Sequence, residues 1–350
     1  MPWNVGQKIL SFLELPRGQG WDKTVEKIIA EGENLDEYRN RVLEYLIKHY
    51  QCGEKMLRLH SVDRAIGEQI ASAIRDAVIP PSSFLEHYPA LVPSDQLNGL
   101  STTPTLVNVT VGDGGTVATF ASVRVLSVRE ELEREDFPEE AADALSRFDE
   151  LVGIRHVKWQ AMDVVKISPD FTEIDVRVDA PLGMPSTAGD VVHALIRKEL
   201  ALMTVGDLLP QPMNLFPLID RIYKAEGEGI VVELAFGTTT ASLKHEKMRR
   251  RRTCLRQEAY HRGGKRALAS DIEIHRLSVL WPLPLGRALS RPELTLSASA
   301  RSAGATHPIL TNAMIRNCAD DTEFEHVRSR MLHFYRLMNE ERNENIEDGC

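Results

Sequence analysis

The sequence lacks the short motifs by which most enzymes and metal-binding proteins are recognised. It contains no glycine-rich nucleotide-binding fingerprint, no phosphate-binding loop of the Walker type and no nucleophile motif. His245, Cys254 and His261 match no zinc-ligand spacing, and a fourth ligand is missing. We therefore expect neither a cofactor nor a bound metal, and the sequence favours a protein that binds rather than catalyses.

Paired cysteines and long apolar runs are also missing. Without a C-x-x-C pair, a disulfide framework is not expected, and a reducing, cytoplasmic environment is favoured. No run of about 18 apolar residues is present, as a membrane-spanning helix would require. The apolar patch over residues 9–15 is interrupted by Ser11 and Glu14, so we expect no signal peptide. The four cysteines are Cys52, Cys254, Cys318 and Cys350.

Acidic residues outnumber basic ones in the chain as a whole, but the basic residues are concentrated in one stretch. The 350 residues carry a formal net charge of −9 and are 43% hydrophobic, which is typical of a globular protein, and the length suggests two domains. Residues 244–266 nevertheless hold ten lysines and arginines against two glutamates. Because neighbouring cations repel one another, this stretch needs an anionic partner.

Arginine is the most numerous residue of this basic stretch, and its planar guanidinium donates two parallel hydrogen bonds to a phosphate. If the stretch is helical, Arg249, Arg252 and Arg256 lie on one face. We predict a non-catalytic protein, alone or as one component of a larger complex, that binds the phosphate backbone of DNA or RNA. The predicted site consists of Lys247, Arg249, Arg250, Arg251, Arg252, Arg256, Arg262, Lys265 and Arg266.

The same charges have a second interpretation. They would also pair with acidic patches of this chain or with an acidic protein partner, in which case the protein is an assembly component. Gly263 and Gly264, between basic residues, suit a turn whose backbone N–H groups bind an anion, and equally the plain end of a helix.

Residues 1–95 read as a helical region. Helical periodicity runs over 34–50 and again over 62–78, where two prolines end it, and a Pro- and Ser/Thr-rich stretch over 91–104 marks a boundary. A winged-helix DNA-binding module is an alternative for helices followed by a hairpin. It is disfavoured because the helix over 62–78 offers only two arginines to a groove.

Residues 104–338 alternate strand and helix patterns. Apolar and polar residues alternate over 105–126 around a Gly-Asp-Gly-Gly turn, which predicts a β-hairpin, and the acidic stretch over 128–152 is expected to be helical. The basic insertion, residues 243–267, therefore lies between strands of one sheet. The remaining strands are expected over 159–178, from 230, over 272–283 and over 294–300, and helices over 187–202 and 218–224.

These patterns predict an α+β protein: a helical N-terminal region, a mixed β-sheet domain with a basic insertion, and a C-terminal helix. The tail over 339–350 is acidic and expected to be disordered. Apolar residues of the last helix suit core packing against the sheet or, alternatively, a helix-to-helix seam of a homo-oligomer. They are Phe324, Val327, Met331, Phe334 and Met338.

Acidic residues of the strands over 159–178 and the residue that follows them suggest a metal-dependent phosphodiesterase as an alternative function. Restriction-type nucleases hold a metal between a Pro-Asp and an (Asp/Glu)-x-Lys on neighbouring strands. Here Arg177 stands where that motif has lysine, so we expect these acids to line the exposed side of a half-buried sheet. They are Asp163, Asp170, Glu173, Asp175 and Asp179.

Overall fold

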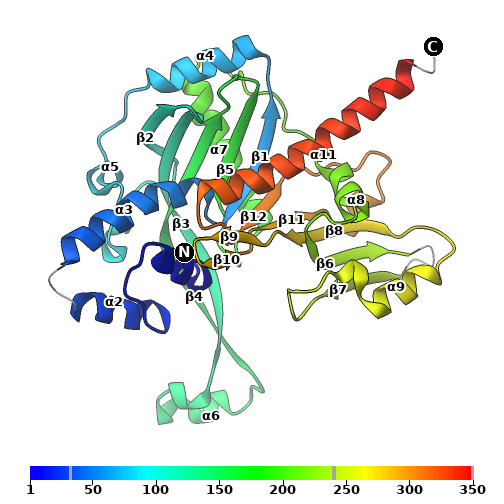
Figure 1. The fold of residues 1–350 in the computed structure, drawn as a ribbon. Helices are drawn as coiled ribbons and strands as arrows, with labels where there is room; N and C mark the ends of the chain where they lie inside the picture. Colours follow the sequence, from blue (N-terminus) through cyan, green and yellow to red (C-terminus); the bar gives the residue numbers. More distant parts are fainter. Residues whose placement is uncertain (31–33, 239–241, 348–350) are drawn as a thin grey trace.

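The computed structural model describes residues 1–30, 34–238 and 242–347. A ten-stranded sheet runs through the middle of the protein, and helices pack against it (Figure 1). Its strands are β1 (Lys55–Ser61), β2 (Thr105–Gly112), β3 (Gly115–Leu132), β4 (Leu151–Ile167), β5 (Glu173–Asp179), β6 (Ile230–Gly237), β7 (Leu243–Lys247), β8 (Glu273–Leu280), β11 (Glu293–Ser297) and β12 (Ala313–Arg316).

The order of the strands is β2-β3-β4-β5-β1-β12-β11-β8-β6-β7, and a separate hairpin joins β9 (Leu283–Leu285) to β10 (Ala288–Ser290). The α+β architecture is confirmed, but all pairings between the described strands are antiparallel, where a mixed sheet was expected. Hairpin connections account for much of this, because a short turn joins only antiparallel neighbours.

Eleven helices are described. Two cover one face of the sheet near its centre: α4 (Arg64–Arg75) and α7 (Ser186–Met203). Three pack on the opposite face or its edge: α8 (Phe216–Lys224), α9 (Ala259–Arg266) and α11 (Asp321–Glu347). The others are α1 (Trp3–Phe12), α2 (Gly20–Ala30), α3 (Leu35–Cys52), α5 (Ser83–His87), α6 (Ala142–Leu145) and α10 (Ala300–Ala303).

β1 was missed from the sequence, and it lies at the centre of the sheet. It pairs with β5 on one side and β12 on the other, so residues 1–95 are not a separate helical region. Both faces of β1 are covered: Met56 packs toward α4 and α7, whereas Leu57 packs toward α8 and α11. A strand buried on both faces shows no clean alternation of polar and apolar residues, and Arg58 further obscures it.

The predicted hairpin of β2 and β3 is confirmed. Gly115 in its turn has a φ of +102°, and a Cβ at this position would lie 1.9 Å from the carbonyl oxygen of Ile167. Only glycine fits there, because any side chain would clash with the neighbouring strand. β3 then continues to Leu132, so the stretch over 128–152 is not one helix as expected. It forms the outer part of a two-stranded ribbon, with short helical turns and α6 at its tip (Figure 1).

The C-terminal helix packs in the chain's own core. The five apolar residues predicted to share one face are buried, and four of them belong to the core between α8, α11 and the sheet. Core packing is therefore confirmed, and a dimer seam through the same face would have to displace it. The chain after residue 339, expected to be a disordered tail, continues α11 to Glu347, and residues 348–350 lie outside the described residues.

A buried network of charges joins α11 to β5. The Arg177 guanidinium is fully buried, donates hydrogen bonds to Asp175, Asp321 and Glu325, and stacks 4.1 Å from the ring centroid of Phe324. Alternating acids on β5 predicted an exposed face, and that expectation is wrong, because α11 covers it. The network is completed by Lys166, Arg328 and Glu173.

Glu325 makes this network sensitive to acid. Burial tends to raise the pKa of Glu325, but Arg177, Lys166 and Arg328 lower it from 4.5 to about 2. A carboxyl whose folded-state pKa is depressed stabilises the protein above its unfolded-state pKa, and that contribution disappears as the pH falls. We expect Glu325→Gln to show a smaller decrease in unfolding free energy than wild type between about pH 4.5 and about pH 2. Urea titrations across this range measure it, and an unchanged pH profile would contradict the assignment.

Candidate nucleic-acid interface

The basic insertion begins in β7, the last strand of the sheet. β7 pairs with β6, and the chain then turns through residues 248–254 before a short helical turn (Leu255–Gln257) and α9. We call residues 249–252 the arginine turn. It is not helical, so the expected helical face of Arg249, Arg252 and Arg256 does not exist, whereas the predicted placement of the insertion between strands is confirmed.

Three of the four arginines in the arginine turn have no acidic partner. Arg249, Arg250 and Arg252 are exposed, and none of them lies within 4.0 Å of a carboxylate of residues 1–30, 34–238 or 242–347. Arg251 alone forms an ion pair, with Glu293 of β11. The acidic surface of the described chain therefore does not neutralise this turn, although the protein as a whole is negatively charged.

Lys247 and the arginine turn border a polar face of the sheet. In β6, Glu233 pairs with Ser278 of β8, whose hydroxyl lies 2.8 Å from that of Thr295 in β11. Side chains of directly paired residues share a face, so these three lie on the same side. Lys247 pairs with Glu233 across the strands and lies on that side too. Arg251 also lies there, because it reaches Glu293, two residues before Thr295 in β11.

Glu233 draws two further basic groups onto this polar face. Its Oε1 accepts hydrogen bonds from Arg276 Nε at 2.7 Å and lies 2.9 Å from His245 Nε2. Burial tends to raise the pKa of Glu233, but His245, Arg276 and Lys247 lower it overall. Glu233 thus stays ionised and holds the side chains of Arg276 and His245 beside Lys247. Neither Arg276 nor His245 was predicted as a site residue. Arg276 lies in β8, after the basic insertion, and His245 lies in β7, before the arginine turn.

Arg256 anchors the insertion and is not available to a ligand. Its guanidinium donates hydrogen bonds to carbonyl oxygens at the end of α8 and in the turn that follows: those of Ile222, Tyr223, Ala225, Glu228 and Gly229. The last carbonyls of a helix have no partner within the helix, and a cation there is favoured by the helix dipole. Among the nine predicted site residues, Arg256 therefore has a structural role, because its guanidinium is occupied by these carbonyls.

His261 fixes α9 against the sheet. Its Nδ1 lies 2.6 Å from Glu246 Oε2, and its Nε2 lies 2.8 Å from the hydroxyl of Tyr223 in α8. Burial raises the pKa of Tyr223 to about 12, so the phenol keeps its proton and its hydroxyl shares a hydrogen bond with the imidazole. The carboxylate, the imidazole and the phenol satisfy one another, and His261 is only 3% exposed. This chain of hydrogen bonds joins α9 to α8 and β7.

The basic residues of α9 lie on the other side of β7 from the arginine turn. Glu246 faces α9, and Lys247, the next residue, points to the opposite face because side chains alternate along a strand. Arg262, Lys265 and Arg266 therefore form a second group, near an exposed Tyr260. Gly263 and Gly264 lie inside α9, so the predicted anion-binding turn is absent.

A small cavity of about 150 Å³ separates α9 from β6 and β7. Lys244 and Lys265 line it together with Phe236 and Tyr260, and Tyr260 is 76% exposed. Lys265 also lies 4.9 Å from the ring centroid of Tyr223, which holds its side chain in place. An exposed aromatic ring beside lysines is the combination on which unpaired bases stack in proteins that bind single strands.

The acids proposed for a metal-dependent nuclease do not converge. Val165 pairs with Val176, so Asp163 shares a face with Val176, whereas Asp175 points to the other face. Asp163 pairs with Arg124, Asp175 with Arg177 and Arg328, and Asp179 with Lys55. Within the part of the chain that the structure describes, no group of three or more His, Cys, Asp or Glu side chains could hold a metal ion.

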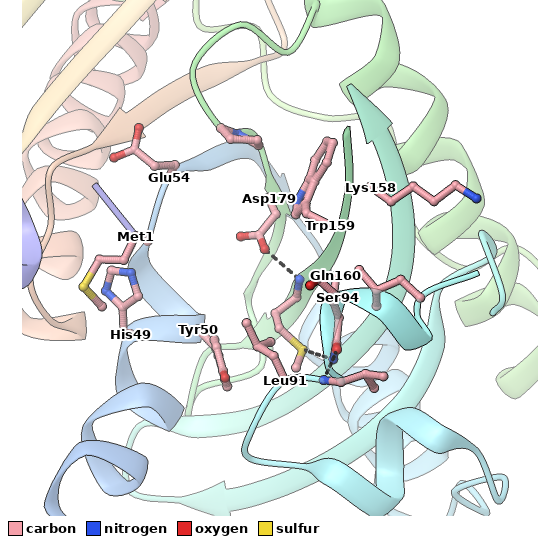
Figure 2. A pocket seen from close by; sticks show the side chains of 15 residues that line it. Met1, His49, Tyr50, Glu54, Leu91, Ser94, Lys158, Trp159, Gln160 and Asp179 are labelled. Atoms are coloured by element: carbon pink, nitrogen blue, oxygen red, sulfur yellow. Dashed lines mark hydrogen bonds between the residues drawn. The ribbon is translucent and has the colours of Figure 1, made fainter. Parts of the chain in front are cut away.

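A larger cavity of about 360 Å³ lies between the end of α3, the start of β1 and strands β4 and β5 (Figure 2). Two of its polar side chains, Asp179 and Gln160, are already bonded to the protein. Asp179 accepts hydrogen bonds from Lys55 and from the backbone N–H of Met162, and Gln160 accepts one from the backbone N–H of Val92. Burial lowers the pKa of His49 to about 4, so this histidine is neutral. The cavity offers apolar walls but few unsatisfied groups.

Two comparisons with known proteins found no relative: no family model matches the chain, and no curated protein matches it. Among the described residues, no helix has both the length and the apolar character needed to cross a bilayer.

Proposed function

We propose that the protein binds nucleic acid through the arginine turn and the adjoining polar face of β6 to β8, and that it contacts phosphates instead of reading bases. The observation that carries this proposal is the exposure of Arg249, Arg250 and Arg252 without any carboxylate partner among the described residues. Guanidinium groups placed this way gain most from phosphate, because each group donates in a planar, bidentate geometry.

The rigid base of the insertion supports the same proposal. The pairing of β7 with β6 before the arginine turn and the contacts of Arg256 after it hold the segment at two points, so the intervening arginines are carried by an anchored turn at the edge of the sheet. Less conformational entropy is lost on binding when the backbone is already fixed. Lys247, His245 and Arg276 extend the positive surface along the polar face.

An acidic protein partner is the second candidate, because the unpaired arginines would equally bind carboxylates. The phosphodiesterase alternative has less support, since its carboxylates are ion-paired and divided between two faces of the sheet.

Purified protein tests the proposal directly. We expect it to bind labelled duplex DNA, single-stranded DNA or RNA in fluorescence anisotropy titrations, with an affinity that falls steeply as salt rises from about 50 to about 200 mM. Asp170→Asn, at the exposed acid of the Pro-Asp pair, serves as the control for the nuclease alternative: it should leave binding intact, and no magnesium-dependent cleavage should be seen in either protein. Absence of salt-dependent affinity for any of these nucleic acids would reject the proposal in favour of an acidic protein partner.

A further inference from the structure

A polar cavity of about 380 Å³ lies on the α4 and α7 side of the sheet, away from the basic insertion. It is bounded by β1, α7, residues 207–212 and Thr311. Arg58, His60, His193 and Arg197 all line it. Cavities of about 300 to 1,000 Å³ are typical of small-molecule sites, so this one is large enough for more than a single ion.

His193 is a buried polar side chain without a partner. It is 3% exposed, and neither of its ring nitrogens has a hydrogen-bond partner among the described residues. The carbonyl of Met56 faces the ring closely enough to influence its pKa, but outside hydrogen-bond geometry. Most buried polar groups are paired, because an unsatisfied one costs about 1 to 3 kcal/mol. His193 lines the cavity, and rotation of its buried ring would bring a nitrogen to a ligand or water within it.

The positive groups of the cavity are more buried than the acids that pair with them. Arg58 donates to Asn312 and to Asp190, and Arg197 donates to Asp207 and to two backbone carbonyls. The side chains of Asp190 and Asp207 are 45% and 50% exposed, against 20% for Arg58 and 29% for Arg197. Asp207 lines the cavity as well, but solvent screens both acids more strongly than the arginines, so the positive charges are the less screened ones.

Both histidines of the cavity have lowered pKa values, mainly because they are buried. Burial, followed by Arg58, His60 and Arg124, lowers the pKa of His193 well below its ordinary value. Burial also lowers the pKa of His60 to about 4, helped by Arg197 and Arg58, against the Pro210 carbonyl and the more distant Asp175. Both imidazoles are neutral near neutral pH. A metal ion would meet repulsion from the two arginines and would find no third histidine, cysteine or carboxylate ligand among the described residues.

We propose that this cavity binds a small molecule through an oxyanion group, either a phosphoryl group or a carboxylate, which hydrogen-bonds to His193 and lies near Arg58. The Nη1 of Arg58 has no described hydrogen-bond partner and remains to donate to such a group. Thr311 and Gln211 line the remaining wall and contact the rest of the molecule.

Binding of an oxyanion is coupled to proton uptake. The negative charge favours imidazolium, so it raises the pKa of His193, and affinity therefore increases as the pH falls through that raised value. Sulfate isolates this effect because it stays a dianion throughout the range. We expect its affinity, measured by calorimetry or by histidine NMR signals, to rise by up to about tenfold per pH unit between about pH 8 and about pH 6.

Variants and probes separate the outcomes. His193→Gln should bind sulfate more weakly and lose the pH dependence, and Ala194→Trp, which adds bulk at the lining of the cavity, should abolish binding without touching its buried groups. His156→Gln, on the exposed ribbon, is the matched control and should behave as wild type. Stronger binding of inorganic phosphate than malonate assigns a phosphoryl ligand, and the reverse assigns a carboxylate.

The proposal fails if none of sulfate, phosphate or malonate binds at either pH. It also fails if binding survives Ala194→Trp unchanged, a result that decides the matter even if His193→Gln does not fold. Sulfate or phosphate bound by the arginine turn would survive Ala194→Trp, so only binding that this variant removes is assigned to the cavity, and a failure here leaves the function proposed for the basic insertion untouched.

Discussion

Replacement of Arg249, Arg250 and Arg252 by glutamine is expected to weaken nucleic-acid binding and to flatten its salt dependence. Each cation that neutralises a phosphate contributes about −0.9 to the slope of log K against log salt on duplex DNA and about −0.7 on single strands. Loss of three contacts would therefore change the slope by up to about 2.7 on duplex DNA and up to about 2 on single strands. The affinity should fall about equally for all sequences, because phosphate contacts carry no base information.

A control with the same change of net charge distinguishes local contacts from general attraction. Arg39, Arg75 and Arg301 are exposed, have no ion pair among the described residues and lie outside the insertion. Their replacement by glutamine should leave the slope close to that of wild type. Equal effects of the two triple variants in anisotropy titrations would show that the arginine turn makes no specific phosphate contacts.

Replacement of the buried Arg177 by methionine is expected to remove about 3 to 5 kcal/mol from the free energy of unfolding, because it leaves buried carboxylates without their main cation. Asp175 would keep Arg328, and Asp321 and Glu325 would keep Lys166. A loss of about 3 to 5 kcal/mol is a large part of the total stability of about 5 to 15 kcal/mol that is usual for a folded protein.

The exposed pair of Arg155 and Glu130 provides the matched control. Their side chains are 65% and 43% exposed, so Arg155→Met should change the unfolding free energy by less than about 1 kcal/mol. Urea denaturation followed by circular dichroism compares the two variants, and an Arg177→Met variant that is already unfolded in buffer agrees with the expectation. A cost for Arg177→Met no larger than that for Arg155→Met would contradict the importance of the buried network.

Elements with a clear period were predictable from the sequence. The hairpin of β2 and β3, helix α7 and the buried face of α11 all follow from apolar spacing and turn residues. β1 was not, because it is covered on both faces and its cations are buried by partners far along the chain: Lys55 meets Asp179, and Arg58 meets Asp190. No local pattern reveals such partners.

The basic insertion shows the same limit at the proposed binding surface. Charge density alone located Arg249 to Arg252, but the sequence does not tell which arginines are free. Arg256 looks equivalent to its neighbours, yet it binds carbonyls of residues 222–229, about 30 positions earlier. The contributions of His245 and Arg276 depend on Glu233, whose position is set by the pairing of β6 with β7 and β8.

The pairing of β1 with β12 constrains how the chain assembles. Lys55 lies opposite Ile315, so the centre of the sheet joins segments 260 positions apart, and distant pairings of this kind are associated with slow folding. During synthesis, β1 to β5 are complete by residue 179, long before β12 is made. Until residues 313–316 emerge from the ribosome, β1 has one unpaired edge. Nascent chains of intermediate length therefore carry an open strand edge, which makes them more prone to aggregation than the finished protein.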